Sequence, residues 1–352
     1  MKERINWIDW GKALAVTTVV FCHLPQSQDW FYFRYLQTCI ISIFFFLSGY
    51  LKKSNDSVKA NWKKYWYGLI LPYIIYNIVI YPYWLAKYYM QNSGSLDIQI
   101  FIRPILGALL FEHESTFCEP LNGPLWYLPA ILLMHIIVDL CRNNHYKHHV
   151  MIILCFFSIF IYAVNKFYLF LPNLTFIGII SRLPIYFIGY YMSQKNLFKK
   201  TTPQKDLIIG FLLMVCSIAL FQWHLFLFYY GNTSHLLSID FLLHIALFYP
   251  VNICFVFGIL SICKVLNNHH FGIIVNLSIG TLVIVGLHIV IITIINFIIE
   301  RLLHIQGVIY YQWYEAFPIS IAIVTILYPC IYIGKQYFPV LLGRKSPKDI
   351  SI

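Results

Sequence analysis

Ten apolar runs, each about as long as a membrane-crossing helix, dominate the sequence and restrict what it can fold into. They lie near residues 5–24, 35–51, 65–86, 125–141, 150–171, 176–193, 207–230, 239–263, 273–299 and 316–338. A helix needs about 20 mostly apolar residues to cross the hydrocarbon core of a bilayer. The pattern therefore predicts an all-α polytopic membrane protein with about ten transmembrane helices.

The composition supports a membrane protein and excludes other classes. Hydrophobic residues make up 60% of the 352 residues and charged residues only 11%, against about 45–50% and about 25% in soluble domains. So few charges could not cover the surface of a soluble globular protein, and so many apolar residues exclude a disordered chain. No shift in composition divides the chain, so residues 1–352 are predicted to form a single membrane domain.

An eleventh apolar run, 98–111, is too short to cross a bilayer and contains Arg103 and Pro104. It is predicted to be a re-entrant or interfacial segment. If it does not cross, the loops that hold most of the Lys and Arg residues, including 52–64 with its five lysines, lie on the same side as both termini. Cytoplasmic loops are enriched in Lys and Arg, so both termini are predicted to be cytoplasmic.

The excess of basic residues is interpreted as this topological bias and not as a nucleic-acid surface. There are 25 Lys and Arg against 14 Asp and Glu, and most of the basic residues lie in short loops. The nine cysteines show no spacing typical of a metal site, and His145, His148 and His149 have no acidic partners nearby in the sequence. No metal site and no nucleic-acid partner are predicted.

Ionisable residues inside the first run are the strongest indication of a functional site, because such groups are costly in a bilayer. Lys12 and His23 are eleven residues apart, which places them on one face of a helix and about 16 Å apart along its axis. Asp9, nearly one turn before Lys12, can pair with it. The alternative to a functional site is that Asp9 and Lys12 form an ion pair at one membrane surface and that His23 is a surface residue at the other.

Short motifs that follow one another along the chain resemble those of one membrane enzyme family. The first run has a basic residue, ten residues and a histidine, as Lys12 and His23 stand here, and the second run ends in a Phe-rich Ser-Gly-aromatic motif at Phe44–Tyr50. The later motifs are Lys63-Lys64 followed by Leu71–Tyr73, then Gly123–Leu128, Arg182–Gly189 and Gly286–His288. Taken together, residues 5–338 resemble acyltransferase family 3, the integral-membrane O-acyltransferases.

This resemblance implies a membrane O-acetyltransferase of the bacterial inner membrane with no permanently bound cofactor. The usual donor is acetyl-CoA from the cytoplasm, and the usual acceptor is a sugar hydroxyl of an envelope or surface polysaccharide or of its lipid-linked precursor. His23 corresponds to the catalytic residue. Lys12, Asp9, Arg182 and His288, which also lie in apolar runs, are further catalytic candidates.

The residue types fit this chemistry independently. Transfer from a thioester to a hydroxyl needs a base for the hydroxyl proton, which neutral imidazole can supply, and a donor or cation for the developing oxyanion. The phosphates of coenzyme A need basic groups, and four lysines near the 52–64 loop are placed for them: Lys52, Lys53, Lys63 and Lys64. Ser48 and Gly49 could let the donor approach the backbone closely. The alternatives are plain loop topology for the lysines and helix packing for Ser48 and Gly49.

Acceptor binding is predicted near the loop that precedes the fourth run. Trp126 could stack on a sugar face, with Asn122 and Glu119 as polar contacts, although these residues could equally belong to a solvated loop. His224, His244 and His288 fall in the same half of the predicted bundle as His23. They suggest a polar cavity that opens outward, while each alone also fits a structural histidine.

Two rival interpretations remain open at this point. A polar cavity in a ten-helix bundle could export a polysaccharide or transport a small solute, although the sequence shows no inverted repeat and no matched pair of broken helices. A scaffold with a degenerate site in a polysaccharide synthase is the other. For the enzyme, the expected partners are acetyl-CoA, a glycan or lipid-linked sugar acceptor, and membrane lipids.

Overall fold

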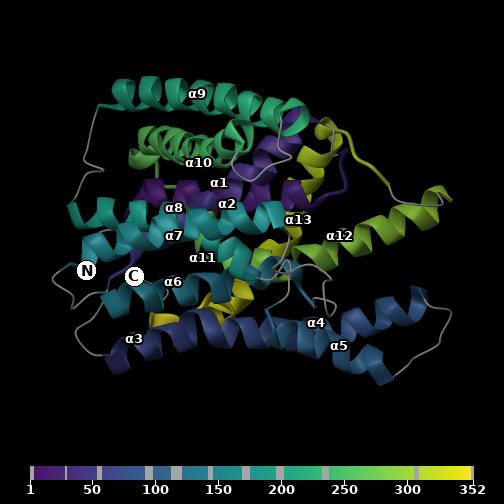
Figure 1. Cartoon of the computed structure of the whole chain (residues 1–352). Helices are drawn as coiled ribbons and strands as arrows, with labels where there is room; N and C mark the ends of the chain where they lie inside the picture. The colour runs from purple at the N-terminus through teal and green to yellow at the C-terminus, as the bar shows by residue number, and fades with distance from the viewer. Residues whose placement is uncertain are drawn as a thin grey trace.

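The computed structural model describes residues 4–27, 30–53, 58–91, 98–111, 121–141, 146–168, 175–195, 202–231, 238–304 and 309–349. Within these ranges the chain consists of helices and connecting loops (Figure 1). The α-helices are α1 (Asn6–His23), α2 (Phe31–Leu51), α3 (Val58–Tyr65), α4 (Leu71–Gln91), α5 (Ile98–Leu109), α6 (Tyr127–Cys141), α7 (Lys147–Tyr168), α8 (Thr175–Lys195), α9 (Pro203–Tyr230), α10 (Ile239–Val265), α11 (Gly272–Ile279), α12 (Thr281–Leu303) and α13 (Trp313–Gln336). The other helical segments are short: the π-helix η1 (Trp66–Ile70) and the 3-10 turns η2 (Gly123–Trp126), η3 (Leu266–Asn268), η4 (Pro339–Leu342) and η5 (Pro347–Asp349).

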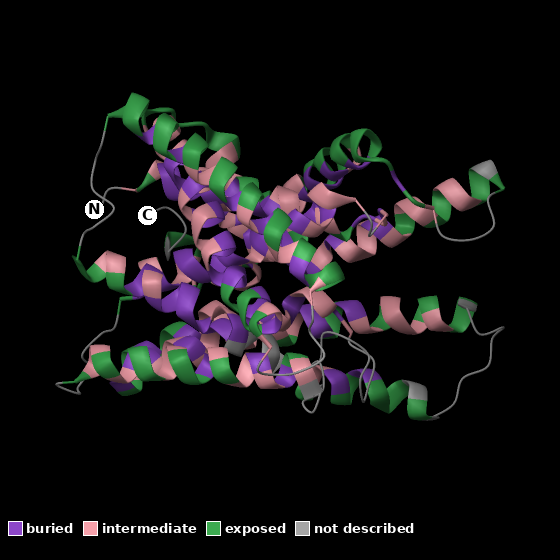
Figure 2. Cartoon of the chain, turned by 45° about the horizontal axis from the view of Figure 1, so that its top comes forward, coloured by how far each residue is buried: buried purple, intermediate pink, exposed green. Residues whose placement is uncertain are grey.

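The predicted all-α membrane fold is confirmed. Among the described residues, eight helical segments are long and apolar enough to cross a membrane: Phe31–Leu51, Lys59–Met90, Gly123–Cys141, Lys147–Phe167, Pro203–Tyr230, Ile239–Asn268, Thr281–Leu302 and Trp313–Gln336. The first and sixth expected runs also form helices, α1 and α8, which are not in that set. Buried residues concentrate in the middle of the bundle (Figure 2). Helices α2 and α10 lie there, whereas α9 covers α10 and is mostly exposed.

The ninth expected run differs from its prediction, because it is two helices and not one. Helix α11 ends at Ile279, and α12 begins at Thr281. Between them Gly280 packs so closely against α13 that a Cβ there would lie 2.3 Å from a side-chain carbon of Ile331. The Thr281 hydroxyl donates to the carbonyl of Ser278 at 3.0 Å, which satisfies a backbone group freed by the break. The break turns Ser278 and Thr281 toward the interior cavity described below.

The short run 98–111 forms a helix of 12 residues, α5. It lies antiparallel beside α4 (Figure 1), because the Tyr81 hydroxyl donates to the carbonyl of Phe101 at 3.0 Å and the Tyr73 hydroxyl to that of Ala108 at 2.6 Å. At about 1.5 Å per residue, α5 spans roughly 18 Å. That is little more than half of a hydrocarbon core of about 30 Å.

Helices α2 and α8 approach each other at two glycines. A Cβ on Gly49 would lie 2.1 Å from the carbonyl oxygen of Tyr186, and one on Gly189 would lie 2.2 Å from that of Phe46. Small residues let membrane helices pack backbone to backbone. The Ser-Gly-aromatic motif of α2 therefore serves helix packing through Gly49, which decides one alternative left open by the sequence.

We predict that Gly49→Ala destabilises the protein. The added methyl group meets the backbone of α8, which cannot rotate away as a side chain could. The loss in free energy of unfolding should therefore reach or exceed the value typical of overpacking, about 1–3 kcal/mol. Thermal unfolding of purified protein in detergent measures it. Gly272→Ala is the matched control, because no atom lies within 4 Å of a Cβ there. Equal melting temperatures for the two variants would contradict the close α2–α8 contact.

Candidate active site

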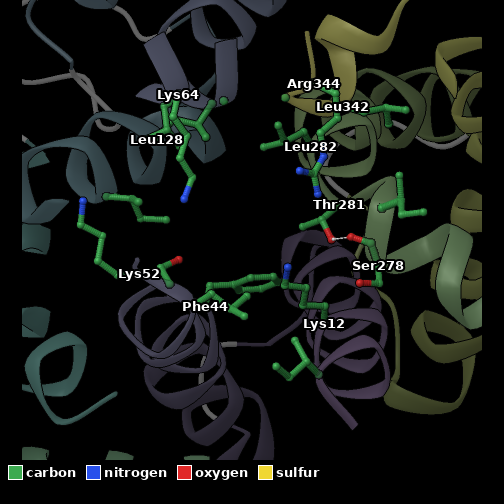
Figure 3. Close-up of a pocket in the computed structure, with 18 of the residues that line it drawn as sticks. Lys12, Phe44, Lys52, Lys64, Leu128, Ser278, Thr281, Leu282, Leu342 and Arg344 are labelled. Carbon is green, nitrogen blue, oxygen red and sulfur yellow. Dashed lines mark hydrogen bonds between the residues drawn. The ribbon is translucent and has the colours of Figure 1, made fainter. Parts of the chain in front are cut away.

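A cavity of about 500 Å³ opens at the end of the bundle where α1 begins (Figure 3). Its lining is strongly basic. Six basic residues line it, with Asp9 as the carboxylate among the lining residues: Arg4, Lys12, Lys52, Lys53, Lys64 and Arg344. Apolar side chains such as Phe44 and Leu128 form its remaining walls. Because Arg4 and Arg344 both line it, the two described ends of the chain lie at the same end of the bundle.

Asp9 pairs with Arg4 and not with Lys12, in contrast to the pairing that the spacing suggested. Arg4 Nε lies 2.6 Å from Asp9 Oδ2, and Arg4 Nη2 lies 2.9 Å from Oδ1. The Ser278 hydroxyl donates to Oδ1 at 2.6 Å. A bidentate guanidinium suits a carboxylate better than an ammonium does, so Arg4 displaces Lys12. The start of α1 is thereby fixed to α11.

Lys12 is left facing the cavity. Its ammonium points into the open space in Figure 3, near Thr281 and Arg344. Within the described part of the chain it forms no ion pair or hydrogen bond. A cation in this position can meet the negative charge of a ligand without first breaking a salt bridge.

Lys52 is held by residues that the sequence analysis did not select. Its side chain is only 1% exposed, and its ammonium lies 2.9 Å from Asp139 Oδ1. The hydroxyl of Tyr65 bonds both Lys52 and Asp139. The signal that could have identified Asp139 is a carboxylate near the inner end of the fourth apolar run, where an unpaired charge is costly.

A second buried hydrogen bond lies beside this pair. His135 Nδ1 is 2.6 Å from the hydroxyl of Tyr186, and its ring lies 5.5 Å from that of Tyr65. His135, to which the sequence gave no role, lines the cavity. The cavity wall formed by α6 is therefore polar at depth, although α6 is an apolar helix.

The structure separates the other predicted donor-binding residues. Lys53 and Lys64 line the cavity, as does Ser48 on α2. Lys63 is exposed on α3 and does not line it. Lys63 and Lys64 are neighbours in sequence but point in different directions, because successive residues of a helix are about 100° apart.

Arg344 is a lining residue that no sequence motif indicated. The turn η4 precedes it and is fixed to α4, because the Tyr76 hydroxyl donates to the carbonyl of Leu341 at 2.8 Å. Gly343 has φ +67°, a left-handed conformation that glycine adopts readily. A Cβ on Gly343 would also lie 3.0 Å from the carbonyl oxygen of Gly68 in the π-helix. This turn directs Arg344 into the cavity (Figure 3).

His23 lies beyond this cavity, at the other end of α1, and lines a smaller one of about 40 Å³. Its side chain is exposed, and its ring lies 4.9 Å from that of His288, which is fully buried. His288 Nδ1 lies 2.9 Å from the carbonyl of Ile284 and 3.0 Å from that of Val285. Since carbonyl oxygens only accept, Nδ1 carries the proton and Nε2 is an acceptor. Within the described structure Nε2 has no hydrogen-bond partner.

The two cavities share part of their walls. Phe44 and Tyr127 line both of them, with ring centroids 6.2 Å apart. On α2, Ile41 and Phe44 line the His23 cavity, while Phe44 and Ser48 line the basic one. These positions fall on one face of the helix. The rings of Phe44 and Tyr127 therefore form an aromatic wall between the basic cavity and the His23 cavity.

The predicted acceptor-binding residues lie partly at the His23 cavity. Trp126 lines it. Asn122 is buried and donates to the carbonyl of Gly286 at 2.8 Å, which holds the turn η2 against α12 near His288. Glu119 lies outside the described residues.

Arg182 lines neither of these cavities. Its Nη1 donates to Ser181 Oγ at 2.6 Å, and its guanidinium lies 5.4 Å from the ring centroid of Phe248. His224 and His244 also lie elsewhere, against each other. The histidines expected in one outward cavity therefore form two separate pairs. His23 lies beside His288, and His224 lies beside His244.

Comparison with known protein families agrees with this geometry. The model of an acyltransferase domain family matches residues 5–334. The chain belongs to this family, acyltransferase family 3, and is a multi-pass membrane acyltransferase. No curated protein and no solved structure matches the chain.

We predict that Asp139→Asn destabilises the fold, because it removes the carboxylate charge 2.9 Å from the buried ammonium of Lys52. Breaking a buried pair costs about 3–5 kcal/mol, and a value near the lower end is expected since Asp139 is 22% exposed. Thermal unfolding in detergent measures the loss. The double variant Lys52→Met, Asp139→Leu should recover most of it, because no charge remains to be paired. A single variant as stable as the parent would show that the pair is not needed.

Proposed function

We propose that this acyltransferase is a membrane O-acetyltransferase, which moves acetyl from acetyl-CoA to a sugar hydroxyl of an envelope or surface polysaccharide or of its lipid-linked precursor. One observation carries the proposal. A strongly basic cavity lies at one end of α1, a smaller cavity with an accessible histidine lies at the other, and Phe44 and Tyr127 line both. Family membership favours this function over the exporter interpretation.

The basic cavity suits the nucleotide end of coenzyme A. That end carries several phosphate charges, and charge-assisted hydrogen bonds from Lys and Arg are the strong ones. In this proposal Lys53, Lys64 and Arg344 bind the phosphates, and Lys12 meets the phosphate group that lies nearest to α1. Lys52 and Asp139 shape the wall. Asp9, through Arg4 and Ser278, positions the α1 segment that carries Lys12.

In this proposal the pantetheine arm, which is long and slender, runs through a passage between the rings of Phe44 and Tyr127. Lys12 and His23 are about 16 Å apart along α1, so a donor with its phosphates at Lys12 must extend its thioester between Phe44 and Tyr127 to reach His23. Two consequences follow. Lys12 acts on the donor and not directly on His23, and the acceptor approaches from the opposite side of the passage.

The reaction at His23 then requires few groups. The imidazole accepts the proton of the acceptor hydroxyl as its oxygen attacks the thioester carbonyl. The C–O bond forms, the C–S bond breaks, and the leaving thiolate takes the proton from the imidazolium. His288 is a positioning residue in this proposal, because its buried ring lies 4.9 Å from the His23 ring and restricts how that ring can turn. Trp126 offers a face for the sugar ring.

The end of the bundle with the lysines is proposed to face the cytoplasm, where acetyl-CoA is made, in a bacterial inner membrane. The loop charges support this orientation. The acceptor hydroxyl would then meet His23 from the outer half of the membrane, and the acetyl group would cross most of the bilayer on its carrier.

We predict that His23→Ala lowers acetyl transfer by about 10²–10⁴-fold, the usual contribution of a general base. The measurement is transfer of labelled acetyl from acetyl-CoA to a panel of glycan acceptors by protein in nanodiscs, with thermal unfolding as a check of folding. His149→Ala, on an exposed histidine at the start of α7, is the control and should keep full activity. Unchanged transfer by folded His23→Ala would reject the base assignment.

We predict that Lys64→Ala raises the Michaelis constant for acetyl-CoA several-fold, with a smaller effect on turnover, because only donor binding loses a cation. Lys63→Ala, one residue away and outside the cavity, should leave both constants unchanged. Initial rates at varied acetyl-CoA measure the difference. Equal effects of the two substitutions would mean that the lysines act only through topology.

A further inference from the structure

A third cavity, of about 380 Å³, lies among the ends of α2, α7, α9 and α10, at the same end of the bundle as His23. Four basic or titratable side chains line it: Arg34, Lys166, His224 and His244. No carboxylate of the described residues lines it. Asp240, nearly one turn before His244, lies instead against Gly231 at the start of α10.

The two histidines are fixed so that their outer nitrogens are available. Their rings stack with centroids 4.0 Å apart and an angle of 9°. His224 Nδ1 lies 2.9 Å from the carbonyl of His244, and His244 Nδ1 lies 3.1 Å from that of His224. Both Nδ1 atoms therefore donate, and each Nε2 can donate to an anion only when its ring is protonated. Stacked imidazoles repel each other when protonated, and an anion beside them offsets that repulsion.

Arg182 adds positive charge behind the cavity wall. Its guanidinium lies over Phe248, which lines the cavity. It forms no ion pair within the described part of the chain, and its Nε is buried without a hydrogen-bond partner. A buried charge without a counterion is costly, so an anion in the cavity would stabilise this arrangement.

The cavity lies at the depth of lipid headgroups. Arg34 is in the first turn of α2 and Lys166 in the last turn of α7. Exposed aromatic residues mark the same level at the end of α9, namely Trp223, Tyr229 and Tyr230. Trp and Tyr are enriched at the membrane–water interface. The Arg34 guanidinium lies 5.3 Å from the ring centroid of Tyr229.

We propose that this cavity binds the phosphate of an anionic membrane lipid. Arg34 and Lys166 supply the charge and the charge-assisted hydrogen bonds, the stacked histidines line the cavity beside them, and the rings of Phe221 and Phe228 contact the lipid chain. Basic pockets between membrane helices bind lipid phosphates in this way. The proposal does not depend on which acyl group or acceptor the enzyme uses.

The site also has a fixed relation to His23. Arg34, Thr38 and Ile41 follow one another on one face of α2, and Ile41 lines the His23 cavity. From Arg34 to Ile41 is about 10 Å along the helix. The bound lipid is either a phospholipid or the diphosphate carrier of a sugar, and the second would bring its sugar toward His23.

The test is lipid binding by the purified full-length protein, followed by native mass spectrometry in a neutral detergent. The probes are phosphatidylglycerol, a polyprenyl diphosphate and zwitterionic phosphatidylcholine. We expect one or both anionic lipids to bind more tightly than phosphatidylcholine, and the tighter of the two identifies the source of the phosphate. Arg34→Gln with Lys166→Gln should weaken that binding about 30-fold, about fivefold for each basic residue removed.

Two comparisons keep the test decisive. Lys87→Gln with Arg301→Gln removes two exposed basic residues from the same end of the bundle, outside the cavity, and should leave binding unchanged. Lys166→Gln alone, on an exposed residue, should weaken binding about fivefold if the double variant fails to fold. The proposal is overturned if neither anionic lipid binds more tightly than phosphatidylcholine, if both pairs of substitutions weaken binding equally, or if inorganic phosphate displaces the lipid.

Discussion

A charge inside an apolar bundle must find a counterion, a hydrogen-bond partner or a ligand, and the site of this protein is organised by that constraint. Asp9 is satisfied by Arg4 and Ser278, and Lys52 by Asp139 and Tyr65. These two pairs fix the ends of α1 and α2. They leave Lys12 facing open space, where a ligand can supply the missing negative charge.

Helix α2 connects the parts of this arrangement. One face of it lines all three cavities in succession, with Arg34 at the third cavity, Ile41 at His23 and Ser48 at the basic cavity. An adjacent side of α2 is fixed to α8 through Gly49 and Gly189, where the backbones touch. A helix held so closely cannot shift without disturbing every cavity, so the packing glycines matter to function although no ligand meets them.

The proposed mechanism divides binding from chemistry by about 16 Å along α1. Phosphate recognition occupies Lys64, Lys12 and Arg344, and proton transfer occupies His23 with His288 beside it. Because the passage between them is lined by Phe44 and Tyr127, water and charged phosphates are disfavoured there. The same proposed division accounts for a basic residue and a histidine that lie eleven residues apart on α1.

The sequence by itself determined the helices, the short α5 and the shared face of Lys12 and His23, because hydrophobic length and helical period are local properties of the chain. Its motifs also indicated the family. Contacts between distant segments were decided only by the tertiary structure. Asp9 pairs with Arg4 and not with Lys12. The break at Gly280 lies where that residue packs against Ile331, and the turn at Gly343 places Arg344 in the wall of the basic cavity. The direction of Lys64 into the cavity and the pairing of His224 with His244 likewise depend on how neighbouring helices are rotated, which periodicity within one helix does not specify.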